Sequence, residues 1–228
     1  MNGRVLITGA AGALGRSVVR QFVAAGERVL AVGDRGLAEI ASMAPPDVVR
    51  IHKADLTVTS EVDRLFAVAD EDGLSAVVHT VGGFRWGKTA DFSDDDWSFL
   101  LKVNLDSTFR VFRATARAFT KTQGGSLVAV ASPAGVLGES GMGAYAATKA
   151  GVLRLVESLA RELAPVGARA NSVLPGTMDT AANRAAMPEA DPGQWVTTDA
   201  VASVIHFLTT PAASAVNGAA VRVPGPIL

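Results

Sequence analysis

The sequence predicts one α/β domain with a doubly wound, seven-stranded and mostly parallel sheet that carries helices on both faces. Short apolar runs rich in Val, Leu and Ile alternate with longer segments of helical period, as in repeated strand–helix–strand units. The length of 228 residues suits one sizeable core and is short for two ordinary domains. We therefore expect residues 1–228 to form a single domain.

Seven apolar runs have the length and composition of buried strands. In chain order they are Arg4–Thr8, Arg28–Val32, Val48–His52, Ala76–Thr80, Ser126–Ala131, Arg169–Leu174 and Ala219–Val223. Five segments of helical period lie between them, namely Leu14–Ala25, Ser60–Glu71, Trp97–Thr122, Tyr145–Ala164 and Thr198–Leu208. Gly26 and Gly167 stand where helices should stop, because glycine readily takes the left-handed conformation that ends many helices.

The stretch from Pro175 to Val196 is the least regular part of the chain and has no clear period. A compact domain seldom contains so long an irregular segment unless the segment is functional or mobile. We expect residues 175–196 to form a substrate loop or lid.

Composition excludes several classes of function. The formal net charge is -1 and the calculated pI is near 6.3, which gives no basic surface for nucleic acid or an anionic membrane. No apolar run reaches the roughly 18 to 20 residues that cross a bilayer. Cysteine is absent, and His52, His79 and His206 share no ligand spacing, so we expect no metal site. The lack of cysteine and of a signal-peptide pattern before Arg4 favours a cytoplasmic location.

A glycine-rich turn, TGAAGALG from Thr8 to Gly15, follows the first expected strand and opens the first expected helix. Gly9 and Gly12 let the backbone approach a pyrophosphate, and Gly15 lets helix and strand pack closely. A tight structural turn is the alternative, but this place in a parallel sheet favours a dinucleotide. We expect six residues to bind the cofactor, namely Gly9, Ala11, Gly12, Ala13, Leu14 and Gly15.

Two acidic residues follow the next two strands. Asp34 lies 19 residues after Gly15, where a carboxylate can accept hydrogen bonds from the adenosine ribose and repel a 2′-phosphate. This favours NAD(H), whereas the neighbouring Arg35 could bind that phosphate, so NADP(H) is not excluded. Asp55, with Leu56 beside it, is placed to contact the adenine, and a turn or capping role is the alternative for Asp55.

The only tyrosine, Tyr145, precedes Lys149 by four residues. In a helix this spacing puts both side chains on one face, where an ammonium group can stabilise a phenolate. A tyrosine made more acidic in this way can transfer protons near neutral pH.

The chain resembles the short-chain dehydrogenase/reductase family from end to end. The features that carry the resemblance are TGAAGALG, Asp55, Asn104 in KVNLD, Ser132, YAATK from Tyr145 to Lys149, and Pro175-Gly176. Their order and spacing match, and Ser132 stands 13 residues before Tyr145 as that family's catalytic serine does. The resemblance implies a Rossmann-fold, NAD(P)-dependent oxidoreductase.

Site roles follow from the resemblance. Tyr145 would exchange a proton with the substrate oxygen while hydride moves to or from the nicotinamide, and Lys149 would lower the phenol pKa and bind the nicotinamide ribose. Ser132 would hold the substrate oxygen, and Asn104 would anchor a water that relays protons to Lys149. Gly82, Pro175 and Gly176 are expected beside the cofactor, together with Tyr145 and Lys149 themselves.

Several departures from the family pattern point to a narrower group. GALG, VGGF and above all LPGTMDTAANRAAMPEAD from Leu174 to Asp191 are similar to dihydropteridine reductase-like members, which use NADH on quinonoid dihydropterins. Ser132 weakens that transfer, because those enzymes lack the serine. A general ketone or 3-oxoacyl reductase or an alcohol dehydrogenase is therefore the alternative, and a non-catalytic dinucleotide-binding sensor or scaffold is the alternative of another class.

Substrate contacts and partners are the remaining expectations. Trp86 and Trp195 could stack on both sides of a flat small-molecule substrate, and Met178 could line an adaptable pocket, although packing alone also explains the tryptophans. The helix after Lys149 carries more apolar residues than one narrow stripe requires, which predicts a homodimer or homotetramer.

Overall fold

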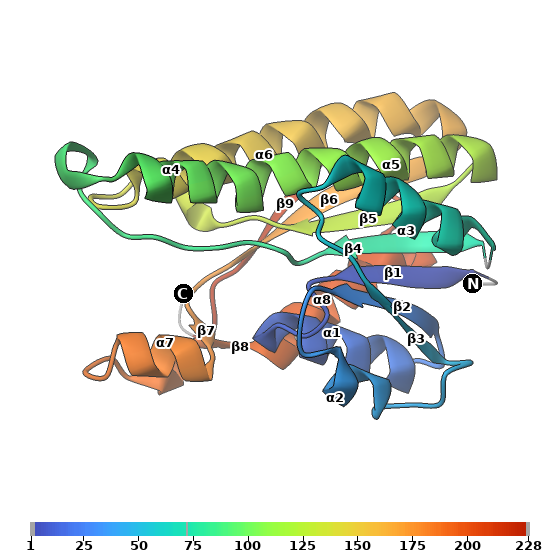
Figure 1. Ribbon diagram of the computed structural model, residues 1–228, viewed down its shortest axis with the longest axis horizontal. Helices are drawn as coiled ribbons and strands as arrows, with labels where there is room; N and C mark the ends of the chain where they lie inside the picture. Colours follow the sequence, from blue (N-terminus) through green and yellow to red (C-terminus); the bar gives the residue numbers. More distant parts are fainter. Residues whose placement is uncertain (1–2, 72, 227–228) are drawn as a thin grey trace.

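A computed structural model describes residues 3–71 and 73–226 of the chain (Figure 1). Its main sheet has seven strands in the order β3-β2-β1-β4-β5-β6-β9, and every pair of neighbours is parallel. The strands are β1 Arg4–Thr8, β2 Arg28–Gly33, β3 Val49–Lys53, β4 Leu74–His79, β5 Gly125–Val130, β6 Ala168–Pro175 and β9 Ala220–Val223. The α/β, doubly wound architecture is thus confirmed.

The strand order reverses between β1 and β4. The chain runs outward from β1 to β3, returns to lay β4 on the other side of β1, and continues outward to β9. Adjacent loops separate at such a point, so the carboxyl ends of β1 and β4 flank a crevice in which open α/β sheets bind ligands.

Helices cover both faces of the sheet (Figure 1). They are α1 Ala13–Ala24, α2 Leu37–Ala41, α3 Thr59–Glu71, α4 Asp94–Leu100, α5 Ser107–Thr122, α6 Gly143–Leu163, α7 Ala181–Ala186 and α8 Thr198–Thr209. Single 3₁₀ turns occur at Thr89–Asp91, Pro133–Gly135, Ala164–Val166, Pro192–Gln194 and Pro211–Ala213. No helix in the described ranges is long and apolar enough to cross a membrane.

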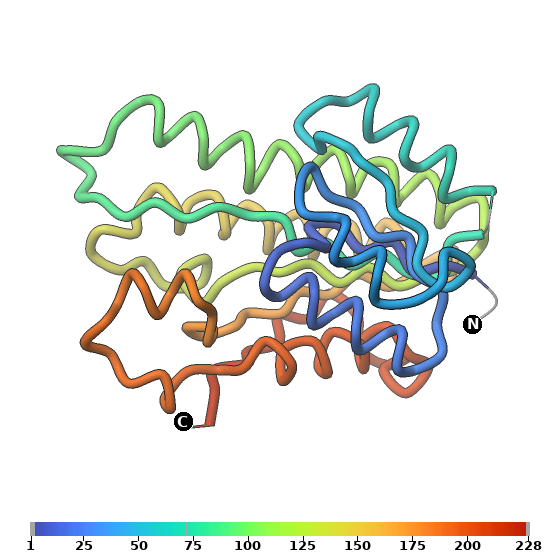
Figure 2. The backbone as a smooth tube through the Cα atoms, turned by 60° about the horizontal axis from the view of Figure 1, so that its bottom comes forward, coloured from blue at the N-terminus to red at the C-terminus, as the bar shows by residue number. Residues whose placement is uncertain are grey.

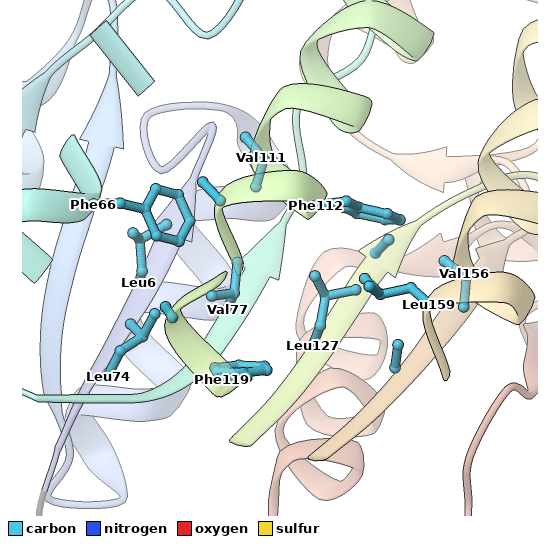
Figure 3. Packing of buried hydrophobic residues seen from close by; sticks show 14 of the residues in the cluster. Leu6, Phe66, Leu74, Val77, Val111, Phe112, Phe119, Leu127, Val156 and Leu159 are labelled. Atoms are coloured by element: carbon cyan, nitrogen blue, oxygen red, sulfur yellow. The ribbon is translucent and has the colours of Figure 1, made fainter. Parts of the chain in front are cut away.

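Alternation along the strands divides the core into two layers. Leu6 of β1 packs in the layer under α3, α5 and α6, whereas its neighbours Val5 and Ile7 pack in the layer under α1, α2 and α8. Figure 3 shows the first layer, where Phe66 of α3 and Phe119 of α5 lie over the sheet. Burial on both faces is why the central strands β1, β4, β5 and β6 are largely apolar.

The expected helix from Trp97 to Thr122 is interrupted. Between α4 and α5 the residues Leu101–Asp106 form a π-helical turn, which widens the helix by one residue. Its middle contains Asn104, which is fully buried. Propensity does not distinguish α from π turns, so the sequence predicted one continuous helix.

The apolar residues of helix α6, whose number predicted an oligomer, are covered within the single chain. Its apolar residues Val152, Val156 and Leu163 are buried against the sheet and α5 within the single chain. They therefore need no partner subunit to cover them. Aromatic residues left exposed on α4 and α5, among them Trp97 and Phe109, are better candidates for a subunit interface.

Residues 175–196 are more regular than the sequence indicated. Met178–Asp179 (β7) pairs in parallel with Val196–Thr197 (β8), and α7 lies between them. Thr180 caps α7 through the amide of Asn183. In Figures 1 and 2 this segment projects at the same end of the molecule as the loop between β4 and α4.

Candidate active site

Many of the expected site residues lie in loops at the carboxyl ends of β1, β2, β4, β5 and β6, whereas Tyr145 and Lys149 lie on α6 and Asn104 in the π-helical turn. Parallel strands place these ends at one edge of the sheet, so residues far apart in sequence meet there. The glycine turn follows β1, Asp34 follows β2, Gly82 follows β4, Ser132 follows β5 and Gly176 follows β6.

The glycine turn has the geometry of an anion cradle. Gly9 has φ +68°, and a Cβ on Gly15 would lie 2.1 Å from the Gly9 carbonyl oxygen, so neither position accepts a side chain without movement of the backbone. Gly12 caps α1 without a side-chain hydrogen bond, and the first turn has no acidic residue. Amide groups at this helix start suit the pyrophosphate of a dinucleotide.

The other residues of this turn have different environments. Ala13 begins α1 at the surface, and Leu14 is buried in the core below it. The Ala11 carbonyl accepts a hydrogen bond from Arg16 Nε at 2.9 Å, which fixes the turn. The side chain of Leu14 therefore packs in the core, and only the backbone of this residue can contribute to a cofactor site.

Asp34 is exposed between two cations. Its carboxylate lies 3.7 Å from Arg35 Nε and 3.9 Å from Lys53 Nζ. Lys53 was not predicted to lie near Asp34. It ends β3 and pairs in register with Gly33, the residue before Asp34. The expected ribose carboxylate is therefore exposed at the carboxyl end of β2, with two positive charges beside it.

Asp55 makes a turn in the chain. Its Oδ1 accepts hydrogen bonds from the Thr57 amide at 2.8 Å and the Thr57 hydroxyl at 2.7 Å, and these bonds lower the pKa of Asp55. The turn role, which was the alternative for this residue, is present. Leu56 is buried, so little of its side chain is open to a cofactor.

Asn104 holds the backbone after β4. Its Oδ1 accepts from the Gly83 amide at 2.7 Å, and its Nδ2 donates to the Gly83 carbonyl at 3.0 Å and to Thr148 Oγ1 at 3.0 Å. A Cβ on Gly82 would lie 3.1 Å from both Asn104 Oδ1 and Lys149 Nζ. The glycine allows this strand end to pass beside the lysine.

Tyr145 and Lys149 lie on the first turns of α6, close to Ser132. Lys149 Nζ is 5.8 Å from the Tyr145 ring centroid and donates to the Val130 carbonyl at 3.1 Å. Ser132 Oγ caps a 3₁₀ turn by accepting from the Ala134 amide at 3.2 Å. The structure thus brings the four expected catalytic residues, including Asn104, to one end of the sheet.

Burial dominates the proton affinities here. Desolvation lowers the pKa of Lys149 to about 8. Desolvation raises the pKa of Tyr145, and a hydrogen bond with Ser132 partly offsets that rise. Burial of the phenol thus opposes the expected lowering of its pKa by Lys149.

His79 is buried in a hydrogen-bonded chain. Its Nδ1 lies 2.8 Å from Thr8 Oγ1 and its Nε2 lies 3.0 Å from Thr108 Oγ1, which itself donates to the Asn104 carbonyl at 2.5 Å. Burial, with a smaller effect from Lys149, lowers the pKa of His79 to about 3. A neutral imidazole therefore links β1 to the π-helical turn.

Pro175 and Gly176 are fixed by the last strand. Pro175 ends β6 opposite Val223, and the Gly176 amide donates to the Val223 carbonyl at 2.9 Å. A Cβ on Gly176 would lie 2.5 Å from the Pro224 carbonyl oxygen. The close approach explains why glycine occupies this position.

The three residues expected to contact substrate differ in how far their side chains are exposed. Trp86 is 63% exposed, with its ring against Gly141. Trp195 is only 8% exposed, because the chain packs it beside β8, and Met178 of β7 packs on the core. The expectation that Trp195 offers an open stacking face is therefore wrong.

Phe84 is a site residue that the sequence reading did not single out. Its ring stands edge-on to Tyr145, with centroids 5.0 Å apart and planes at 81°. The signal was the aromatic residue after the double glycine in VGGF, which indicates an aromatic side chain at the carboxyl end of β4.

A cavity of about 310 Å³ lies beside the site, between the starts of α4 and α6. Its lining includes Phe92, Trp97 and Asp94 together with Gly143 and Ala144, which directly precede Tyr145. Within residues 3–71 and 73–226 no group of three His, Cys, Asp or Glu side chains is placed to hold a metal ion.

Comparison with known proteins places this site in a family. The profile of the short chain dehydrogenase family matches residues 3–191. The chain is 29% identical over 221 residues to an uncharacterized oxidoreductase of Staphylococcus aureus, covering 95% of each chain. It is 29% identical over 233 residues to the 3-oxoacyl-[acyl-carrier-protein] reductase FabG of Salmonella typhimurium, covering 96% of this chain and 95% of the relative.

The fold is shared with solved structures. The crystal structure of an oxidoreductase of the same family from Burkholderia thailandensis superposes with a TM-score of 0.89 at 31% identity, covering 100% of this chain and 93% of the other.

Proposed function

The chain belongs to the short chain dehydrogenase family and is an oxidoreductase, and from this premise we propose that Tyr145 serves as the general acid and base for hydride transfer to or from a small carbonyl, alcohol or quinonoid substrate. The observation that carries the proposal is the convergence of Tyr145, Ser132 and buried Lys149 at one sheet edge. Ser132 follows β5, and Tyr145 and Lys149 lie on α6. Together they have the donors that a substrate oxygen needs.

The residues present fit a nicotinamide dinucleotide. The glycine turn and the start of α1 would hold the pyrophosphate, and Asp34 would hold the adenosine ribose. Gly82 and Gly176 would offer backbone contacts further along the cofactor. The bound cofactor supplies the hydride, and the protein supplies position and proton transfer.

The proton would move at the Tyr145 hydroxyl. Because burial raises the pKa of Tyr145, the phenol holds its proton near neutral pH and donates it to a substrate oxygen during reduction. Ser132, hydrogen-bonded to that phenol, would hold the same oxygen and orient it. The Lys149 ammonium would stabilise the phenolate left behind, at a distance set by the Val130 carbonyl.

We favour NAD(H) over NADP(H) because Asp34 would repel a 2′-phosphate. Arg35 and Lys53 reduce that repulsion, since both flank the carboxylate. Titration of cofactor fluorescence tests the preference. Tighter binding of NADPH than of NADH would overturn it.

Dihydropterin reduction is the second candidate activity. It is favoured by LPGTMDTAANRAAMPEAD from Leu174 to Asp191, and the presence of Ser132 favours a carbonyl or alcohol instead. The Salmonella relative is named a 3-oxoacyl reductase, which makes a 3-oxoacyl thioester a member of the carbonyl class to assay. NADH consumption with quinonoid dihydropterin, measured beside a panel of ketones, separates these candidates.

The variant Tyr145→Phe tests the proposed function. It should abolish turnover and leave cofactor binding intact, because it removes one hydroxyl from a helix that does not depend on it. Retained turnover would exclude the acid–base role. A wild-type protein that binds cofactor but converts no pterin, quinone, ketone or alcohol would point instead to a dinucleotide sensor or scaffold.

We also propose that the protein forms an oligomer. A homodimer or homotetramer would cover exposed aromatic residues such as Phe109 on α5, and light scattering at micromolar concentration measures the oligomeric state.

Residues 175–196 would close over substrate, with the β7–β8 pair as their base. Limited proteolysis should show cleavage in this segment slowed by cofactor.

A further inference from the structure

The aromatic side chain of Phe84 lies against the phenol at the centre of the site. The rings stand edge-to-face with centroids 5.0 Å apart, and Phe84 keeps 48% of its surface exposed. Tyr145 itself is largely covered. A molecule that brings an oxygen to the Tyr145 hydroxyl therefore passes an open aromatic surface.

The backbone before Phe84 is held on both sides. Gly83 exchanges two hydrogen bonds with the Asn104 carboxamide, and a Cβ on Gly83 would lie 2.8 Å from the Phe99 ring. The segment after β4 is thus fixed by the buried Asn104 and by the ring of Phe99. A side chain positioned in this way offers a preformed surface, and a preformed surface binds a ring with little loss of conformational freedom.

The neighbouring loops also expose apolar side chains. Trp86 follows β4, Val136 and Leu137 follow β5, and Met187 follows β6, with exposed fractions of 63%, 53%, 71% and 38%. These strands end at the same edge of the sheet, so the loops border the same crevice. Exposed apolar side chains on loops that border a crevice favour the binding of apolar groups there.

The two arginines in these loops are already paired. Arg85 lies over the Phe99 ring at 4.2 Å and binds Asp96 at 2.9 Å. Arg184 of α7 forms a two-pronged contact with Asp179 at 2.6 and 2.8 Å. Neither guanidinium is held ready for a carboxylate or phosphate on a substrate, because each fork is directed at a protein carboxylate.

We propose that this site takes a substrate with a flat apolar ring next to its reacting carbonyl, and that Phe84 is the residue that selects the ring. The inference rests on the proposed function and gives its substrate class. Phe84 provides a face for the ring through offset or edge contact, and the loop side chains exclude water from its other edge.

Kinetics with two uncharged ketones test the selection. The probes are isatin, which is flat and aromatic, and 2-butanone, which is small and aliphatic, each with the nicotinamide cofactor that the enzyme binds more tightly. Phe84→Ala should lower the ratio of kcat/KM for isatin to kcat/KM for 2-butanone about tenfold. Phe207→Ala on α8 is the matched control, because Phe207 is 46% exposed.

An unchanged ratio of the two kcat/KM values in Phe84→Ala would overturn the inference, as would an equal fall in the control. Phe84→Leu keeps a large apolar side chain if the alanine variant folds poorly, and it should still lose several-fold of the preference for isatin. Preference for a 3-oxoacid over isatin in the wild-type enzyme would also overturn it.

Binding without turnover provides the second readout. With oxidised cofactor the enzyme cannot reduce isatin, so calorimetry measures ring binding alone, and Phe84→Ala should raise the Kd about tenfold. If the wild-type enzyme reduces neither ketone, this measurement still decides the role of Phe84, and the panel of pterins, quinones, ketones and alcohols decides the proposed function. Equal Kd values in both proteins would reject that role.

Discussion

The side chain of Asn104 forms a two-pronged clasp on the backbone of Gly83, accepting from its amide at 2.7 Å and donating to its carbonyl at 3.0 Å. The clasp joins the π-helical turn to the strand end that carries Gly82 and Phe84. Asn104 was expected to anchor a water for Lys149. Its carboxamide is engaged with protein groups, and the water stays a prediction.

Asn104→Ala should therefore destabilise the fold as well as reduce activity. Removal of the carboxamide leaves the Gly83 amide and carbonyl without their partner, at a cost of roughly 1 to 3 kcal/mol for each buried group. We expect a loss of about 3 kcal/mol in the free energy of unfolding, measured with urea. Thr120→Ala, which removes an exposed hydroxyl from α5, is the control and should change stability by less than about 0.5 kcal/mol.

Lys149→Met should raise stability while abolishing turnover. Lys149 is buried and its pKa falls to about 8, so the unfolded chain holds more protons between about pH 8 and 10.5 and wild-type stability rises with pH in that window. Methionine avoids the buried charge and should gain about 2 kcal/mol at pH 7, after loss of the bond to Val130. Unfolding curves at pH 7 and 9.5 measure this, and a variant less stable at pH 7 would contradict it.

His79 should make the protein sensitive to acid. Its pKa of about 3 in the fold lies below the ordinary value of 6.5, so the unfolded chain binds the extra proton and stability falls as pH drops from about 6.5 toward 3. Between pH 7 and 5 this amounts to about 2 kcal/mol. His79→Asn should show a shallower acid slope in chemical unfolding, whereas a variant at half-exposed His52 should keep most of it.

Gly15→Ala should disrupt the cofactor cradle. The added Cβ would lie 2.1 Å from the Gly9 carbonyl oxygen and 2.8 Å from the Ala10 Cα, so the turn must move. We expect at least a roughly tenfold weaker Kd for the dinucleotide, followed by cofactor fluorescence. Gly138→Ala is the matched control, because nothing lies within 4 Å of its added Cβ, and equal effects in both variants would reject the cradle.

The order of strands and helices could be predicted because its signals are local. The apolar runs at β1, β2, β5 and β6 placed those strands within one or two residues, and the glycine turn predicted the start of α1. The separation of four residues between Tyr145 and Lys149 likewise put both side chains at the start of one helix. Such information lies within one or two helical turns of sequence, so neighbouring residues are enough to reveal it.

The long-range contacts could not be predicted in the same way. The clasp between Asn104 and Gly83, the chain from Thr8 through His79 to Thr108, and the pairing of Met178 with Val196 each join residues that propensity treats separately. Propensity also does not show how deeply a side chain is buried, so the burial of Trp195 could not be predicted from the sequence.

The sequence by itself determined the α/β class, the glycine turn and the presence of a Tyr-Lys pair, because each depends on residues close together in the chain. Only the tertiary structure decided which groups face that pair and how their protons are held. Phe84 lies against Tyr145, and Lys149 is buried deeply enough to lower its pKa. These properties depend on desolvation and on contacts between distant strand ends, which exist only once the sheet has assembled.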